Sequence, residues 1–222
     1  MIINYTLKRS KRKSIAISVE QGKVTVKAPM RARSDLIEQF VFSKSDWIQQ
    51  AMDKSMEHIK RFEPLINLHY ALLNGKLIEI DFENNINTKL KEGIIFINRK
   101  YFGNKDAIFL QITKLYKKLA TEQLLHRFKE LANHFGFVYS SIELTSAKKK
   151  WGSCDTRKRI KLNFRLLMLP QPMQDYVIIH ELCHLVEHNH SPKFWNNVAK
   201  YIPNYKQVRK ELKGYSILNT LY

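Results

Sequence analysis

The segment His180-Glu181-Leu182-Cys183-His184 constrains the fold of this chain more than any other stretch. On a helix, residues four apart lie one turn above each other, so His180 and His184 present two imidazoles to one point. Both can then reach a zinc ion at roughly 2.0–2.1 Å. Glu181 lies close to this face without lying between the ligands, where a carboxylate can handle metal-bound water. The motif therefore predicts a helix with a metal site on one face.

The opposite side of this expected helix is apolar, which predicts that the apolar face is buried in the core and that the face with the histidines carries the chemistry. Cys183 flanks the buried side and is expected to act as an inert small hydrophobic residue. The residues expected on the buried side are Ile178, Ile179, Leu182, Leu185 and Val186.

The next histidines offer a third ligand. Ser191-Pro192 is a strong pair for the N-cap and first position of a new helix, so the metal helix should end around His188 or Asn189. A residue at the corner between the two helices can turn back towards the metal. His190 is therefore the expected third ligand.

Three other residues compete for this role. His188 lies one turn beyond His184, although a third in-line position usually lies too far along the helix axis. Glu187 leans to the same face and would alternatively orient a ligand imidazole. Glu211 would serve as a distant acidic ligand, or is simply an exposed acid in the sequence KQVRKELK.

Alternating polar and apolar residues predict strands at 14–19 and 23–28, with Gln21-Gly22 at the turn between them. Ser34 and Ser45 are placed to cap two following helices. Residues 72–82 return to strands around the hairpin signal Asn74-Gly75, and residues 93–98 add another strand.

A long amphipathic helix is expected from about Asn104 to Asn133, with Gly136 placed to end it. A hairpin follows, in which IELTSAKKKWGS leads into the polar turn CDTRK and RIKLNF leads out. Pro170 and Pro172 precede the helix that starts near Met173. These patterns predict an α+β chain with a β-rich N-terminal region, residues 1–100, and a C-terminal region, residues 101–222.

The formal net charge of +18 favours anionic partners such as nucleic acid, although it is also compatible with a solvated surface. The N-terminus lacks the apolar segment of a secretory signal, and no apolar run is long enough for a membrane span. With two cysteines only, a soluble, cytoplasmic protein with no membrane partner is expected. Basic residues cluster at Lys148, Lys149, Lys150, Arg157, Lys158, Arg159 and Lys161, and at Lys8, Arg9, Lys11, Arg12 and Lys13.

Several motifs together resemble the YgjP-like metallopeptidase domain family. They are His180-Glu181-Leu182-Cys183-His184-Leu185, Asn189-His190-Ser191, Phe194-Trp195 and the upstream segment WGSCDTRKRIKLNFRLLMLP, residues 151–170. The resemblance spans nearly the whole chain. It implies a zincin-like core, in which the helix carrying the motif packs under a small mixed sheet, similar to SprT-like and Wss-type proteases that act on proteins attached to DNA. It also implies one zinc ion per chain, with His180, His184 and His190 as ligands and Glu181 as general base.

The expected activity is hydrolysis of peptide bonds in a peptide or protein substrate, by a metal-activated water. The hairpin around Trp151, Gly152 and Ser153 is expected to hold the substrate as an added strand; alternatively, Trp151 is part of the core and Gly152 forms a bulge. Candidates for stabilising the oxyanion are Tyr205, Tyr201 and His188.

Two other functions fit the same residues. One is a nucleic-acid-associated protein whose zinc is structural, with Cys154 or His188 completing a closed set of four ligands. The other is a DNA-stimulated protease acting on DNA-bound proteins through the basic clusters. The lone glutamate beside the first histidine argues against the structural site, and the sequence does not specify an oligomeric state.

Overall fold

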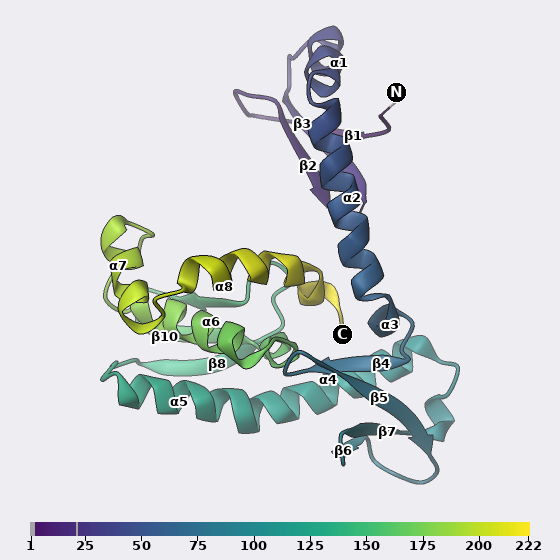
Figure 1. The fold of residues 1–222 in the computed structure, drawn as a ribbon, viewed down its shortest axis with the longest axis vertical. Helices are drawn as coiled ribbons and strands as arrows, with labels where there is room; N and C mark the ends of the chain where they lie inside the picture. The colour runs from purple at the N-terminus through teal and green to yellow at the C-terminus, as the bar shows by residue number, and fades with distance from the viewer. Residues whose placement is uncertain (1–2, 21) are drawn as a thin grey trace. The chain divides into compact units, whose positions relative to one another are not determined.

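The computed structural model describes residues 3–20 and 22–222, and it divides into two compact units that meet between Glu63 and Pro64 (Figure 1). The first unit has one sheet and the second has two, and each unit is described by itself. None of the helices in the described part of the chain is both long and apolar enough to cross a membrane.

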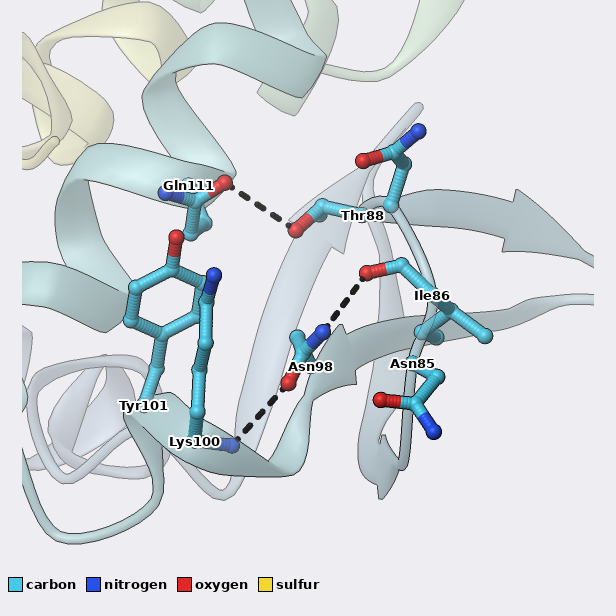
Figure 2. A pocket seen from close by; sticks show the side chains of 8 residues that line it. Asn85, Ile86, Thr88, Asn98, Lys100, Tyr101 and Gln111 are labelled. Carbon is cyan, nitrogen blue, oxygen red and sulfur yellow. Dashed lines mark hydrogen bonds between the residues drawn. The ribbon is translucent and has the colours of Figure 1, made fainter.

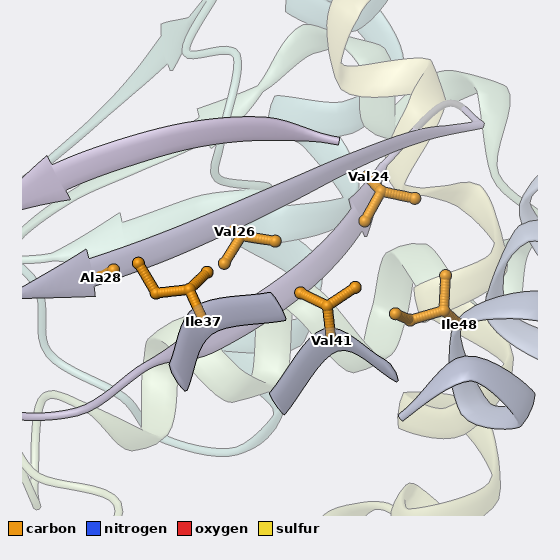
Figure 3. Close-up of a cluster of buried hydrophobic side chains, with 6 residues drawn as sticks. All are labelled: Val24, Val26, Ala28, Ile37, Val41 and Ile48. Atoms are coloured by element: carbon orange, nitrogen blue, oxygen red, sulfur yellow. The ribbon is translucent and has the colours of Figure 1, made fainter. Parts of the chain in front are cut away.

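The first unit has a three-stranded sheet in the order β1-β3-β2. Strands β2 (Ala16–Glu20) and β3 (Lys23–Pro29) form the expected antiparallel hairpin, and β1 (Thr6–Ser10) pairs with β3 in parallel. Because side chains alternate along a strand, every second residue of β3 points to one face. That face is buried by helices α1 (Ser34–Phe42) and α2 (Ser45–Arg61) (Figure 3). The shared core consists of Val24, Val26, Ala28, Ile37, Val41 and Ile48.

Two local details of this unit bear on the sequence analysis. Ser34 was expected to cap α1, but the N-cap is Arg33 and no side chain caps the helix, so that expectation was wrong by one residue. Gly22 has φ +72° in the β2–β3 turn and donates its backbone N–H to the Ser55 hydroxyl at 2.8 Å. Gln21, the other residue of the predicted turn, lies outside the described residues.

The second unit begins with the short helix α3 (Glu63–Ile66) and a four-stranded sheet in the order β4-β5-β7-β6. The predicted hairpin is confirmed, because β4 and β5 are antiparallel and both residues of the Asn74-Gly75 turn have positive φ, as a type I′ turn requires. The predicted strand at 93–98 is confirmed as β7. The strands of this sheet are β4 (Tyr70–Leu73), β5 (Lys76–Glu83), β6 (Lys89–Lys91) and β7 (Ile94–Asn98).

The β4–β5 turn is hydrogen bonded to a distant part of the chain. The backbone N–H groups of Asn74 and Gly75 donate to the carbonyls of Leu167 and Met168, and the Gln174 amide donates to Asn74 Oδ1 at 2.8 Å. These bonds group the second sheet with the C-terminal elements. The boundary between the compact units, after Glu63, thus differs from the sequence-based division after residue 100. The division into a β-rich region, residues 1–100, and a metallopeptidase domain, residues 101–222, stays a prediction.

The long helix expected from about Asn104 to Asn133 is confirmed. After the 3-10 turn η1 (Arg99–Tyr101), it comprises α4 (Lys105–Leu119), a π-helical turn η2 (Ala120–Leu124) and α5 (Leu125–His134). The Asn104 side chain caps it by accepting the Ala107 N–H at 3.1 Å. Gly136, with φ +71°, follows its C-terminal end as expected.

A third, mixed sheet has the order β8-β10-β9, with β9 (Gly152–Cys154) at one edge. Strands β9 and β10 (Arg159–Asn163) form the predicted antiparallel hairpin. The segment before it was expected to belong to the incoming arm, and this was wrong. It forms a separate strand, β8 (Ser141–Thr145), which pairs in parallel with β10 because the loop 146–151 carries the chain across to the opposite edge.

Helix α6 (Gln171–Cys183) carries the histidine motif and follows the 3-10 segment η3 (Phe164–Met168). It packs against β9 and β10 and also contacts α5, α7 and α8 (Figure 1). The α+β class and the core, a motif-bearing helix packed against a small mixed sheet, are therefore confirmed. The chain ends with α7 (Pro192–Tyr201), α8 (Tyr205–Leu212) and the 3-10 segment η4 (Lys213–Thr220).

Helix α6 ends at Cys183, about five residues earlier than expected. Ile178, Ile179 and Leu182 are buried as predicted, but Val186 is 68% exposed. The reason is that the residues beyond His184 lie outside the helix, so the helical periodicity no longer decides which of their side chains are buried. The expectation of a buried Val186 was therefore wrong.

Candidate metal centre

The end of α6 and the start of α7 form a tight corner. His184 is the C-cap of α6 and keeps a helical backbone, with φ −67° and ψ −15°, so it still lies one turn after His180. Ser191 caps α7, as predicted, by accepting the Phe194 N–H at 3.3 Å. The Asn189 side chain accepts the Ser191 N–H at 3.0 Å, which fixes the chain reversal just before the cap. His190 lies in this reversal.

The corner brings three imidazoles together. His180, His184 and His190 each offer a ring nitrogen, and these nitrogens all lie within 4.8 Å of one another. The Nε2 atoms of His180 and His190 are 3.1 Å apart. Among the described residues, this is the group of histidine, cysteine and acidic side chains that could hold a metal ion, and neither His188, Cys154 nor Glu211 belongs to it.

The hydrogen bonds around the rings suit metal binding. His184 Nδ1 lies 3.0 Å from the backbone carbonyl of Glu187; because a carbonyl only accepts, Nδ1 carries the proton and Nε2 has a free lone pair. His180 Nδ1 is buried without a hydrogen-bond partner in the described chain. Burial, together with His184, His190 and Arg209, lowers the pKa of His180 to about 3, so this ring is neutral, the form that binds metals. The donor set therefore fits a divalent cation.

Glu181 is 6% exposed and lies on the sheet side of α6. Burial disfavours the charged carboxylate and raises the pKa of Glu181 to about 8, while the positive charge of Lys150 opposes the rise. A divalent cation nearby would favour the ionised form. The pKa of this carboxyl group is thus close to physiological pH, so that it can both accept and release a proton.

Strand β9 closes over Glu181. A Cβ atom at Gly152 would lie 2.7 Å from Glu181 Cγ and 2.8 Å from Oε1, a distance that real Cβ atoms do not reach. Glycine is therefore required for strand and carboxylate to approach so closely. Trp151 and Ser153 on either side are partly buried, so Trp151 is not a fully buried core residue.

Trp195 of α7 connects the histidines to α8. Its ring stacks on His190, with centroids 5.4 Å apart at 22°, and on Tyr205, with centroids 5.3 Å apart at 10°. The Arg209 guanidinium carbon lies 4.5 Å from the centroid of the Trp195 ring. Arg209 was not among the residues expected from the sequence, although its spacing of four residues from Tyr205 places both on one face of α8.

The remaining candidates lie in different surroundings. Tyr201 packs against the rings of Phe135 and Phe137, whereas His188 is exposed and outside the histidine group. Tyr205 is the oxyanion candidate that reaches the histidine group through ring contacts, because it stacks on Trp195, which in turn stacks on His190.

The competing ligands also have other partners. Glu187 was considered as a side chain orienting a ligand imidazole, but its backbone carbonyl makes that contact. Glu211 is exposed and accepts a hydrogen bond from Gln207 at 2.9 Å. Burial and the charges of Glu181 and Asp155 raise the pKa of Cys154 to about 11, which favours a neutral thiol. Cys183 is fully buried, as expected.

Some of the clustered basic residues are already paired. Arg159 forms an ion pair with Asp155 at 2.7 Å, and Lys161 with Glu143 at 3.3 Å. Arg9 donates to several backbone carbonyls, at 2.7 Å for Ala32. Binding of nucleic acid through the remaining exposed lysines stays a prediction.

A separate polar pocket of about 220 Å³ lies between the end of β7, the segment 85–88 and α4 (Figure 2). Asn98 donates to the Ile86 carbonyl at 3.0 Å and accepts the Lys100 N–H at 3.1 Å. Thr88 and Gln111 are joined by a hydrogen bond of 3.3 Å. This pocket contains no histidine, cysteine or acidic side chain.

Comparison with known proteins places these features in a family. No curated protein matches the chain. A solved structure with a similar segment is the metallopeptidase zymogen of Pyrococcus abyssi abylysin, at 22% identity over 40% of this chain and 91% of that chain, with a TM-score of 0.37. The model of the YgjP-like metallopeptidase domain matches residues 13–215. With nearly its whole length matched, and with the imidazole group inside that range, this chain belongs to the YgjP-like metallopeptidase domain family.

Proposed function

We propose that this chain is a zinc-dependent peptidase in which Glu181 is the general base. Membership of a metallopeptidase family implies a divalent metal and supports peptide hydrolysis. The observation that carries the finer proposal is the convergence of three imidazole nitrogens within 4.8 Å, beside a buried carboxyl group.

His180, His184 and His190 would hold one zinc ion per chain. Three nitrogen donors and no fourth protein ligand are typical of catalytic zinc sites, which keep one position open. When bound, zinc supplies a Lewis acid that polarises a carbonyl group and lowers the pKa of water towards about 7. The carbonyl of Glu187 holds the His184 ring in the orientation that this role needs.

Glu181 would take a proton from the attacking water and pass it to the leaving amine. Its burial supports this role, because a base works best when its pKa lies near the working pH. Gly152 supports it as well, since the absence of a side chain lets β9 approach the carboxylate and fix its position.

The substrate would add to β9 as a further strand. In the sheet order β8-β10-β9, the outer edge of β9 has no strand partner in the described chain. The Trp151 carbonyl accepts the Asn163 N–H at 2.8 Å, so the segment Trp151, Gly152 and Ser153 would pair with an extended peptide through the backbone groups that face away from β10. Such pairing would carry the scissile bond past Glu181. Tyr205 is the preferred candidate for stabilising the oxyanion, with His188 as the alternative.

The test is Glu181→Gln. Because the substitution keeps the size of the side chain and removes the base, we expect cleavage of a denatured protein substrate to fall at least about 100-fold while one zinc per chain is retained. Glu211→Gln is the matched control and should change neither quantity. Cleavage that survives removal of zinc by a chelator would contradict the proposal.

A DNA-stimulated form of this activity is a second candidate, and the net charge of +18 favours it. The exposed lysines 148–150 lie just before β9 and would place DNA near the substrate strand. The expected result is faster cleavage of a DNA-bound protein at low salt. An unchanged rate and unchanged thermal stability with DNA would exclude it. The alternative of a closed structural zinc site is disfavoured, because no fourth ligand joins the three histidines in the part of the chain that the structure describes.

A further inference from the structure

Arg209 places a fixed positive charge one aromatic ring away from the histidines. Its guanidinium lies over the ring of Trp195, at 4.5 Å from the centroid, and Trp195 itself stacks on His190. A guanidinium over an indole is held by the cation–π attraction and loses little freedom when it binds a further group. Arg209 is therefore positioned with respect to the metal centre.

The charge of Arg209 is not neutralised by an ion pair within the described chain. The side chain is exposed, and the charged residues that follow it on α8 are Lys210 and Glu211, the latter hydrogen bonded by Gln207. None of the ion pairs among the described residues of this unit includes Arg209. Its five N–H donors remain available for a planar anion, and a carboxylate is the group that matches their geometry.

A second cation lies before the proposed substrate strand. Lys150 is exposed and lies two residues before Gly152, where β9 begins. A substrate along β9 would thus pass Lys150, and Arg209 offers another cation beside the histidines on the α8 side. This arrangement favours a negatively charged substrate over a neutral one.

We propose that Arg209 is a specificity-determining residue that binds a carboxylate of the peptide substrate beside the metal centre. The carboxylate is either the side chain of an acidic residue or the free C-terminus of the peptide, since both present the same planar anion. The inference rests on the proposed peptidase activity and names the class of substrate that this activity would prefer.

The experiment uses four fluorescent peptides that differ from one another at two places only. They carry either Glu or Gln beside the scissile position, and either a free or an amidated C-terminus. Binding is measured by fluorescence anisotropy to the full-length, zinc-loaded Glu181→Gln protein, which does not consume the peptides. Comparing Glu with Gln tests an acidic side chain, and comparing free with amidated ends tests the C-terminal carboxylate.

We expect one of the two carboxylates to tighten binding about tenfold, and Arg209→Gln to abolish this preference. Arg209→Lys should restore part of it, because the charge returns without the planar pair of donors. Lys210→Gln, one residue away on the same helix, should leave the preference unchanged. Melting temperature and zinc content identify a variant that fails for structural reasons.

The outcomes separate this inference from the proposed function. If the wild-type protein cleaves peptides but the Glu181→Gln protein binds all four equally, or if the preference survives Arg209→Gln, the role of Arg209 is overturned and the peptidase stands. If no peptide is bound or cleaved by the zinc-loaded protein, the proposed function fails, and the role of Arg209 fails with it.

Discussion

The histidine group at the end of α6 and the polar pocket beside β7 both bring hydrogen-bonding side chains together, yet their polar atoms have different partners. In the pocket, Asn98 donates to Ile86 and accepts from Lys100, so donors meet acceptors within the protein (Figure 2). In the histidine group, the Nε2 atoms of His180 and His190 face each other at 3.1 Å, and His180 Nδ1 has no partner in the described chain.

This difference separates a structural polar cluster from a candidate ligand site. A buried polar group that lacks a partner costs free energy, so protein interiors pair such groups. The pocket follows that rule and needs no ligand to do so. The two Nε2 atoms at 3.1 Å can instead share a proton, or the three histidines can give their lone pairs to one cation. The histidine group and the polar pocket should therefore respond differently to zinc and to substitution.

The largest expected effect comes from removing ligands. His180→Ala and His184→Ala should abolish zinc binding and peptide cleavage, and His190→Ala should do the same, whereas His188→Ala should not. For the wild type, zinc at 100 times its Kd adds about 2.7 kcal/mol of stability, and thus raises Tm by about 5–10 °C. Metal analysis and thermal melting with and without zinc measure both effects. Loss of zinc in His188→Ala with retention in His190→Ala would reverse the ligand assignment.

A smaller effect is expected where β9 touches the base. Gly152→Ala would place a Cβ atom 2.7 Å from Glu181 Cγ, and a shift of the carboxylate by about 1 Å should lower kcat/KM about 100-fold while zinc binding is kept. Gly136→Ala serves as the control: an alanine at this positive φ costs about 1 kcal/mol of stability, but its Cβ atom would meet no other atom within 4 Å. Equal activity of the two variants per bound zinc would show that the contact does not position Glu181.

The polar pocket offers the opposite test. Asn98→Ala removes the bonds to the Ile86 carbonyl and the Lys100 N–H, so we expect a loss of about 1 kcal/mol and a fall in Tm of about 2–4 °C. Zinc content and kcat/KM should stay as in the wild type. A change in zinc content would mean that the polar pocket and the histidine group are coupled, which would contradict the distinction drawn between them.

The smallest effect is expected at Glu187. Its backbone carbonyl, not its carboxylate, accepts the proton of His184 Nδ1, so Glu187→Ala should leave zinc affinity within about twofold of the wild type. Competition with a zinc chelator measures the affinity. A tenfold or greater loss, in the range expected when the partner of a ligand imidazole is removed, would assign the orienting role to the side chain.

Local patterns predicted the elements well. The Asn74-Gly75 turn, the long helix from about Asn104 and the Ser191 cap of α7 depend on residues close in sequence, and the structure contains all three. The parallel pairing of β8 with β10 was missed because such pairing is decided by where the connecting loop crosses, which no short pattern encodes. The early end of α6 was missed because the turn after Cys183 depends on packing against α7.

The sequence by itself determined the motif helix, the alternating strands and the choice of His190 as the expected third ligand, because spacing and capping act within a few residues. Only the tertiary structure decided that Gly152 lies against Glu181 and that Arg209 lies over Trp195. In each pair the two residues are separated along the chain and meet only when β9, α6, α7 and α8 pack together. The chemistry of such contacts follows from packing, and packing depends on the whole fold.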